Sequence, residues 1–245
     1  MKKITILAVL AVLASSVQAQ IVSSNSSKIE RIEVAPKEKS GYNRIYAGYA
    51  NLKPHYSTNV NDLSSAVSDR NDDLSPLSGF KVGYLHGSKV ANKIPLFLEW
   101  GAEFAYNQKS GYVGLSNYDD DYEDYCTSKT FGVVIPLNIT YKFEFRNGLY
   151  VAPYAGINGR VNVIGKTTLD ESDEDYDWFD EDDMGEDEAY KRFQFGGQFG
   201  VNLGYKALNV NIGYQMNCPI YKLEESGDYI KLSTRSFTVG LGINF

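Results

Sequence analysis

Residues 129–143 read KTFGVVIPLNITYKF, and apolar or aromatic residues occupy every second position of this stretch. Successive side chains of a β-strand point to opposite faces, so the stretch predicts one strand with two unlike surfaces. The apolar surface comprises Phe131, Val133, Ile135, Leu137, Ile139, Tyr141 and Phe143. The polar surface comprises Thr130, Gly132, Asn138, Thr140 and Lys142. A long strand with one unbroken apolar face is typical of a β-barrel that spans a membrane.

Eight segments of the chain have this alternation or a strand-like composition. They predict an all-β fold, an eight-stranded antiparallel up-and-down transmembrane β-barrel. The segments are residues 44–52, 79–86, 95–106, 129–143, 149–163, 191–205, 208–216 and 235–245. Long connections at 53–78, 107–128, 164–190 and 217–234 alternate with short ones at 87–94, 144–148 and 206–207. Bacterial barrels have long loops outside and short turns in the periplasm, so we expect both termini in the periplasm. A soluble β-sandwich gives no reason for this alternation.

The N-terminus has the residue order of a secretory signal peptide. Lys2 and Lys3 precede an apolar run at residues 4–14, and small residues follow up to Ala19. The run is shorter than the roughly 20 residues that a membrane-spanning helix needs. The expected order is a signal peptide at 1–19, a flexible periplasmic lead-in at 20–41 and an outer-membrane β-barrel domain at 42–245.

Composition narrows the range of partners. The formal net charge is −7, whereas a nucleic-acid partner requires a basic face. The mean hydropathy of −0.33 is compatible with a membrane barrel, because barrel strands alternate lipid-facing and lumen-facing residues. We expect an integral protein of a Gram-negative outer membrane, surrounded by outer-membrane lipid, with no nucleic-acid partner and no cofactor.

The chain has two cysteines, Cys126 and Cys218. Export places them in an oxidising compartment, where an even number is compatible with one disulfide. Both fall in connections expected on the outer side, on nominally opposite loops. A bond between them would therefore require these loops to fold over the barrel mouth.

Charged residues on the inward phase of the strands form a predicted lumen cluster. An eight-stranded barrel has an interior that side chains just fill, so mixed charges there can pair as a plug. On a soluble sheet the same residues would be solvated surface charges. We favour the plug. The cluster consists of Lys81, Glu99, Glu103, Lys142, Arg160 and Arg192.

The sequence does not point to an enzyme. His55 and His86 are the only two histidines, and neither has a Ser and a carboxylate at a recognisable motif spacing. Nucleophilic catalysis requires a nucleophile, a base and an oxyanion donor, and no such set can be named from the sequence. We therefore expect no catalytic residues.

The most acidic stretch, residues 170–188, contains candidate calcium ligands. Ca²⁺ binds several carboxylate oxygens, and three aspartates here have the alternate spacing of a calcium loop. They are Asp173, Asp175 and Asp177. Trp178 stands where an EF-hand requires Gly, and Met184 stands where it requires Glu, so that motif fails. We favour the alternative of a solvated, self-repelling loop.

Two neighbouring strands carry a resemblance to a known family. VIPLNITYKF at residues 134–143 is followed by YVAPYAG at residues 150–156. This resembles the outer-membrane β-barrel domain family of small porin-like proteins, in which an Ile-Pro-Leu strand ends in Tyr-Lys-Phe before a Pro-Tyr-Gly-containing strand. Pro136 and Pro153 each remove a ladder donor, which would require a local bulge or a place above the membrane band. The resemblance accounts for both prolines.

The last strand resembles the signal that the barrel-assembly machinery reads, so this machinery is an expected partner during biogenesis. The residues of that signal are Phe245, Ile243, Leu241, Val239 and Phe237. These features together predict a non-enzymatic, monomeric scaffold that displays long acidic loops on a narrow, plugged barrel. The alternatives are a small porin, or a subunit of an outer-membrane secretion or uptake complex with residues 20–41 as its periplasmic contact.

Overall fold

The structure, a computed structural model, describes residues 41–90, 94–117, 120–145, 147–169, 175–180, 190–225 and 227–245. The predicted signal peptide at 1–19 lies outside these residues, as does the predicted lead-in at 20–41 except for Gly41. Most of the acidic stretch at 170–188 also lies outside them.

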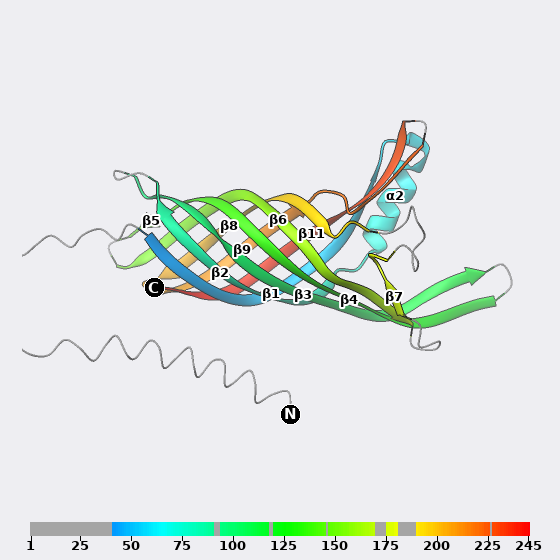
Figure 1. Ribbon diagram of the computed structural model, residues 1–245, viewed down its shortest axis with the longest axis horizontal. Helices are drawn as coiled ribbons and strands as arrows, with labels where there is room; N and C mark the ends of the chain where they lie inside the picture. Colours follow the sequence, from blue (N-terminus) through cyan, green and yellow to red (C-terminus); the bar gives the residue numbers. More distant parts are fainter. Residues whose placement is uncertain are drawn as a thin grey trace, which may run out of the picture. The chain divides into compact units, whose positions relative to one another are not determined.

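Eight long strands form one antiparallel sheet that closes on itself (Figure 1). They are β1 (Gly41–Thr58), β2 (Leu77–Lys89), β3 (Leu96–Asn117), β4 (Asp120–Tyr141), β6 (Leu149–Leu169), β8 (Phe193–Tyr205), β9 (Leu208–Asn217) and β11 (Asp228–Asn244). Each pairs with the next long strand along the chain, and β11 returns to pair with β1. Closure satisfies backbone hydrogen bonds within the sheet, which is the condition for crossing a bilayer with strands. The predicted fold class is confirmed.

The barrel is polar inside and apolar outside. Ile157 and Leu241 are 64% and 71% exposed on the outer face, whereas Glu99 and Asn202 are 0% exposed in the interior. The outward phase predicted for the last strand is confirmed, since its apolar residues are exposed and Ser236 and Thr238 between them are buried. Such an arrangement is stable where lipid, and not water, covers the apolar face.

Outward aromatic side chains meet on adjacent strands. Tyr49 pairs with Phe80, Phe80 with Tyr106, and Tyr106 with Phe131 in the strand register. Further outward aromatic residues lie toward the opposite ends of these and other strands, namely Tyr84, Trp100, Phe143, Tyr205 and Phe245. Aromatic girdles of this kind mark the two membrane interfaces.

The expected loop at residues 107–128 was wrong, because β3 and β4 continue as a paired ribbon. Their register runs without a turn as far as Asn117 and Asp120. The ribbon extends from one end of the barrel (Figure 1). Pairing satisfies backbone hydrogen-bonding groups of both strands, so two adjacent strands that extend beyond the barrel wall remain paired. The alternation of long and short connections in the sequence located these segments but did not reveal the strands and the helix within them.

A helix occupies most of the connection between β1 and β2. It is α2 (Asn61–Asp73), whose sequence NDLSSAVSDRNDD is rich in residues that favour caps and turns over helix interiors. The side chain of Asn71 holds it to β1: its Nδ2 donates to the carbonyl of Tyr56 at 2.9 Å, and its Oδ1 accepts from the Tyr56 N–H at 2.7 Å. This tertiary contact explains a helix that the sequence pattern did not predict. Within the described ranges, no helix is both long and apolar enough to span a bilayer.

Three short strands pair with strands of the ring. They are β5 (Phe143–Glu144), β7 (Asp175–Asp177) and β10 (Tyr221–Glu225). Both β5 and β7 pair with β6, and β10 forms a hairpin with the outer part of β11. At the end that carries α2, most long strands extend beyond the expected boundaries, whereas β8 begins at Phe193 and not at the expected Lys191.

The two prolines lie where pairing is interrupted. Register between β3 and β4 runs from Leu96 to Trp100 and resumes only at Glu103, and the skipped partners on β4 include Pro136. Pro153 directly precedes Tyr154, which forms the last pair of β6 with β4, opposite Thr140. The expectation of a bulge at Pro136 was wrong, since the register shift in β4 lies between Phe131 and Gly132. A gap in the ladder accommodates the missing donor instead.

Candidate functional site

The barrel interior contains a buried ion pair between β1 and β3. Nη2 of Arg44 lies 3.0 Å from Oε1 of Glu99, and the two side chains are 2% and 0% exposed. The Tyr42 hydroxyl also donates to Glu99, and Nε of Arg44 donates to Oδ1 of Asn244 at 3.0 Å. A buried charge requires such partners, because an unpaired one costs several kcal/mol of solvation.

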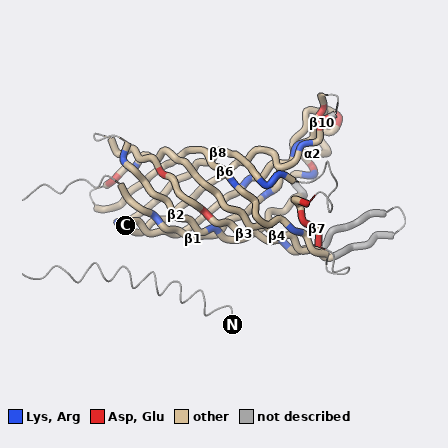
Figure 2. The backbone as a smooth tube through the Cα atoms, viewed as in Figure 1, with Lys and Arg blue, Asp and Glu red and all other residues tan. Residues whose placement is uncertain are grey.

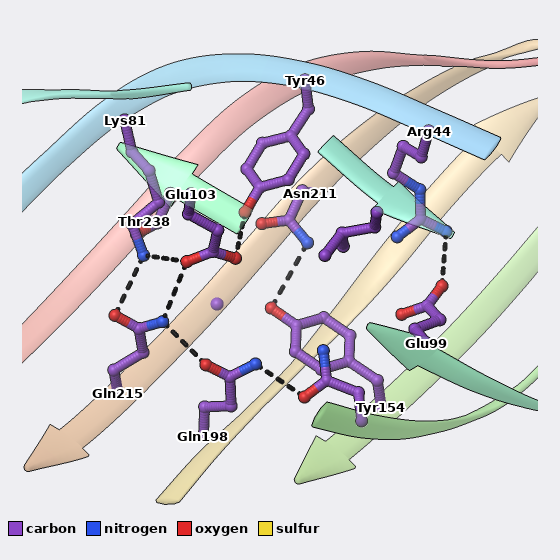
Figure 3. Close-up of a pocket in the computed structure, with 13 residues that line it drawn as sticks. Arg44, Tyr46, Lys81, Glu99, Glu103, Tyr154, Gln198, Asn211, Gln215 and Thr238 are labelled. Atoms are coloured by element: carbon purple, nitrogen blue, oxygen red, sulfur yellow. Dashed lines mark hydrogen bonds and ion pairs between the residues drawn. The ribbon is translucent and has the colours of Figure 1, made fainter. Parts of the chain in front are cut away.

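A second buried ion pair joins β2 to β3. Nζ of Lys81 lies 3.1 Å from Oε2 of Glu103, and it donates to Oε1 of Gln215 at 2.9 Å. The hydroxyl of Tyr46 donates to the other oxygen of Glu103. Figure 3 shows these side chains converging from opposite walls of the barrel. Glu103 is the centre of this cluster, since three donors reach it.

A chain of amides continues the network across the interior. Nε2 of Gln215 donates to Oε1 of Gln198 at 2.7 Å (Figure 3). Nε2 of Gln198 in turn donates to Oδ1 of Asn138 at 2.6 Å. The cavity that remains between these groups and the ion pairs has a volume of about 10 Å³. That volume is at the lower limit for one water molecule.

Inward tyrosines fill space opposite glycines. A Cβ at Gly83 would lie 2.5 Å from Cε1 of Tyr46, and a Cβ at Gly200 would lie 2.5 Å from the hydroxyl of Tyr154. The absence of a side chain at these glycines therefore lets the rings lie against the wall. Tight packing of this kind fills a narrow barrel with side chains.

The structure places four of the six predicted lumen residues in the interior. Lys81, Glu99, Glu103 and Arg160 are between 0% and 4% exposed. Arg160 donates through Nε to Oδ1 of Asn162 at 2.7 Å. These four residues lie on three strands of the closed ring.

The other two predicted lumen residues lie at the barrel ends. Lys142 follows β4 and pairs with Glu144, with its ammonium over the ring of Tyr150. Arg192 precedes β8, has a side chain that is 51% exposed, and lies over the ring of Phe179. The prediction for Arg192 was wrong because the period-two pattern of the sequence continues beyond the end of the barrel wall, where a side chain on the inward phase is no longer enclosed.

Sequence reasoning missed Arg44, which belongs to the most buried ion pair. The first strand gave the weakest pattern because its inward positions include Gly48 and Ala50, whose small side chains are neither clearly polar nor clearly apolar. The sequence signal that could have identified it is the placement of Tyr42, Arg44 and Tyr46 at alternate positions. The structure shows that these three side chains face the lumen.

A Ser, His and Asn cluster lies on the outer face, and sequence reasoning missed it. Nδ1 of His86 lies 2.8 Å from Oδ1 of Asn43, and Nε2 lies 3.0 Å from Oγ of Ser88. An acyl-transfer site further requires donors aimed at the developing oxyanion. Ser88 is paired with strands on both sides, and the N–H of Val90 donates to the carbonyl of Leu96. These particular backbone groups are therefore engaged in strand pairing.

His55 lies on the outer face of β1, beyond the apolar wall. Partial burial lowers its pKa from the ordinary 6.5, and the positive charges of Arg235 and Lys53 lower it further. A lowered pKa favours neutral imidazole in the folded state, so protonation of His55 opposes folding as the pH falls below about 6.5.

We expect an NMR titration of His55 in the folded protein to give a pKa below 6.5, and we expect Arg235→Gln to raise that pKa. Lys206→Gln, at a distant turn, should leave it unchanged. A value that stays fixed or falls in Arg235→Gln would contradict the assigned cause.

The calcium candidates are only partly described. Asp173 lies outside the described residues. Asp175 is held by Lys166 and by the hydroxyl of Thr168, and its pKa is lowered chiefly by those two hydrogen bonds. Asp177 accepts a hydrogen bond from the N–H of Phe179 at 2.9 Å. In the described ranges no group of three or more candidate metal ligands is present. The calcium site stays a prediction.

The suggested disulfide is not formed in the structure. Cys126 lies on β4 and Cys218 follows β9, and neither is in a disulfide. The strands β6 and β8 lie between β4 and β9 in the ring. Because two strands separate β4 from β9, the cysteines are not on adjacent strands, and a disulfide would require the loops to bring the two thiols together.

Comparison with known proteins assigns the chain to a family of β-barrel proteins, in agreement with the closed sheet of the structure. The family model described as outer membrane protein beta-barrel domain matches residues 18–217. The chain belongs to this family. The resemblance carried by the two proline-containing strands is therefore confirmed, and membership of the outer membrane protein beta-barrel domain family implies an outer-membrane location. No curated protein matches the chain.

The solved structures that are similar to the chain include three outer-membrane proteins. Neisserial surface protein A is 14% identical, with 83% of this chain and 97% of that chain covered and a TM-score of 0.41. OprG of Pseudomonas aeruginosa is 11% identical, with coverage of 85% and 97% and a TM-score of 0.39. Ail of Yersinia pestis is 11% identical, with coverage of 84% and 99% and a TM-score of 0.36.

Proposed function

We propose that this protein is a non-enzymatic outer-membrane scaffold whose barrel is plugged and whose extended strands, helix and acidic segments are displayed outside the cell. The observation that carries the proposal is the filled interior. Two buried ion pairs and a chain of amides span it, and the cavity left among them is about 10 Å³. A hydrated ion needs a wider path than a cavity of one water.

The contrast between the two barrel ends supports the orientation. One end carries α2, the ribbon of β3 and β4, and the hairpin of β10 and β11, whereas the C-terminus lies at the other end (Figure 1). Bacterial barrels have their longer connections outside and short turns in the periplasm. The end with α2 is therefore the outer end, and both termini are periplasmic.

A closed ring also supports a monomer. Since β1 and β11 pair with each other along most of their lengths, the barrel needs no second chain to complete its sheet. We expect the protein in mild detergent to migrate on a native gel near the mass of one chain. Stable migration with a defined partner would favour the complex-subunit alternative.

Planar bilayer recordings test the plug. The folded wild-type protein should give no large, steady conductance, whereas Lys81→Ala/Glu103→Ala should conduct measurably more. This double variant removes both charges together, so it shortens two long side chains without leaving either charge unpaired. Heat-modifiable gel migration confirms that each preparation is folded. A steady porin-like conductance from the wild type would overturn the plug and favour a small porin.

A further inference from the structure

Two basic residues face each other on the outer surface, just beyond the membrane-facing wall. Lys53 of β1 and Arg235 of β11 are direct partners in the strand register. Both lie on the outward phase, since the residues on either side of Arg235, Thr234 and Ser236, are buried. Cβ atoms of direct partners on one face are about 5 Å apart, so the two cationic groups occupy one small area.

This pair lacks the acidic partner that the comparable pairs have. Two other pairs of basic residues are direct partners in the described register: Lys129 with Lys166, and Lys222 with Lys231. Lys166 forms an ion pair with Asp175, and Lys222 forms one with Glu224. In the described part of the chain, neither Lys53 nor Arg235 forms an ion pair. Like charges directly opposite each other are destabilising, so this position costs free energy that an external anion would offset.

The pair lies at the height of lipid headgroups. Arg235 is two residues beyond the outward aromatic Phe237, which is about 7 Å along the strand, toward the end with α2. Below Phe237 the outer face is apolar, with Val239 and Leu241 exposed. Charged residues of both signs gather beyond this level, around α2, β7 and β10 (Figure 2). An anion met by Lys53 and Arg235 at this height is a headgroup of the surrounding membrane.

We propose that Lys53 and Arg235 bind a phosphate group of the phosphorylated glycolipid in the outer leaflet. A guanidinium offers paired donors to phosphate oxygens, and the neighbouring ammonium adds a point charge. The apolar wall below them accommodates the acyl chains of the same molecule. The choice of the outer leaflet depends on the orientation given under the proposed function, whereas binding of the phosphorylated lipid does not.

The test uses the folded full chain in nanodiscs and measures binding of phosphorylated lipid A. Lys53→Gln/Arg235→Gln should weaken binding at least about tenfold, because each basic residue near an anionic lipid surface contributes a factor of about five. Lys206→Gln removes a lysine from the turn between β8 and β9 and should not change binding. The double variant removes a repulsion, so it should fold as the wild type does.

Three outcomes would overturn the proposal. They are unchanged affinity in the double variant, equal affinity of the wild type for lipid A without phosphates, and complete displacement by inorganic phosphate at millimolar concentration. The last would identify a site for free phosphate and not for a lipid. Labelling of single cysteines on whole cells tests the orientation separately, so a reversed barrel would be recognised even if purified protein binds the lipid.

Discussion

Arg44→Ala is expected to lower the free energy of unfolding by about 3–5 kcal/mol, the usual cost of removing one partner of a buried ion pair. Glu99 is fully buried and would keep the Tyr42 hydroxyl but lose its only cationic partner in the described residues. Urea-induced unfolding in lipid vesicles, followed by tryptophan fluorescence, measures the change. The loss should be large because lumen charges have little water to solvate them.

A matched variant separates the charge from the packing. Arg44→Met/Glu99→Met keeps much of the side-chain volume and removes both charges, so it should recover a substantial part of the lost stability. Equal losses in Arg44→Ala and in the double variant would mean that the volume of Arg44, and not its pairing with Glu99, stabilises the barrel.

Ile157→Arg is expected to cost about 2–4 kcal/mol, the penalty for a basic residue on the lipid face near the membrane midplane. Ile157 is 64% exposed and pairs with Leu137 between the two ends of the apolar wall. Ser110→Arg, on the part of β3 that extends beyond Tyr106, should cost only about 0–1 kcal/mol. The same unfolding experiment measures both, and similar costs at the two positions would contradict the placement of the membrane band.

The strands that cross the membrane were predictable because their two environments differ sharply. Alternation in residues 129–143 and 235–245 gave the outward phase of β4 and β11, and the structure agrees with both. The ends of the strands were not predictable on this basis. Beyond the lipid both faces of a ribbon meet water, so polar residues occupy both phases and the period fades.

The lumen was predictable as a set of charges but not as a network. Phase alone found Lys81, Glu99 and Glu103, whose partners depend on which strands lie opposite each other across the ring. That information requires the closed register, which brings Arg44 of β1 to Glu99 of β3. Arg192 shows the reverse error, since phase cannot tell where the wall of the barrel ends.

The amide of Asn71 has a consequence for how this protein coexists with its neighbours in a crowded membrane. Pairing of β1 with β2 ends at Leu52 and Leu77, while β1 continues to Thr58 alongside β11. Past Leu52, one side of β1 would present bare N–H and C=O groups, which readily recruit a strand from another molecule. Asn71 occupies both groups of Tyr56 on that side, as a neighbouring strand would. The helix thereby covers this part of the edge of β1, so that it is not available for pairing with a strand of another molecule.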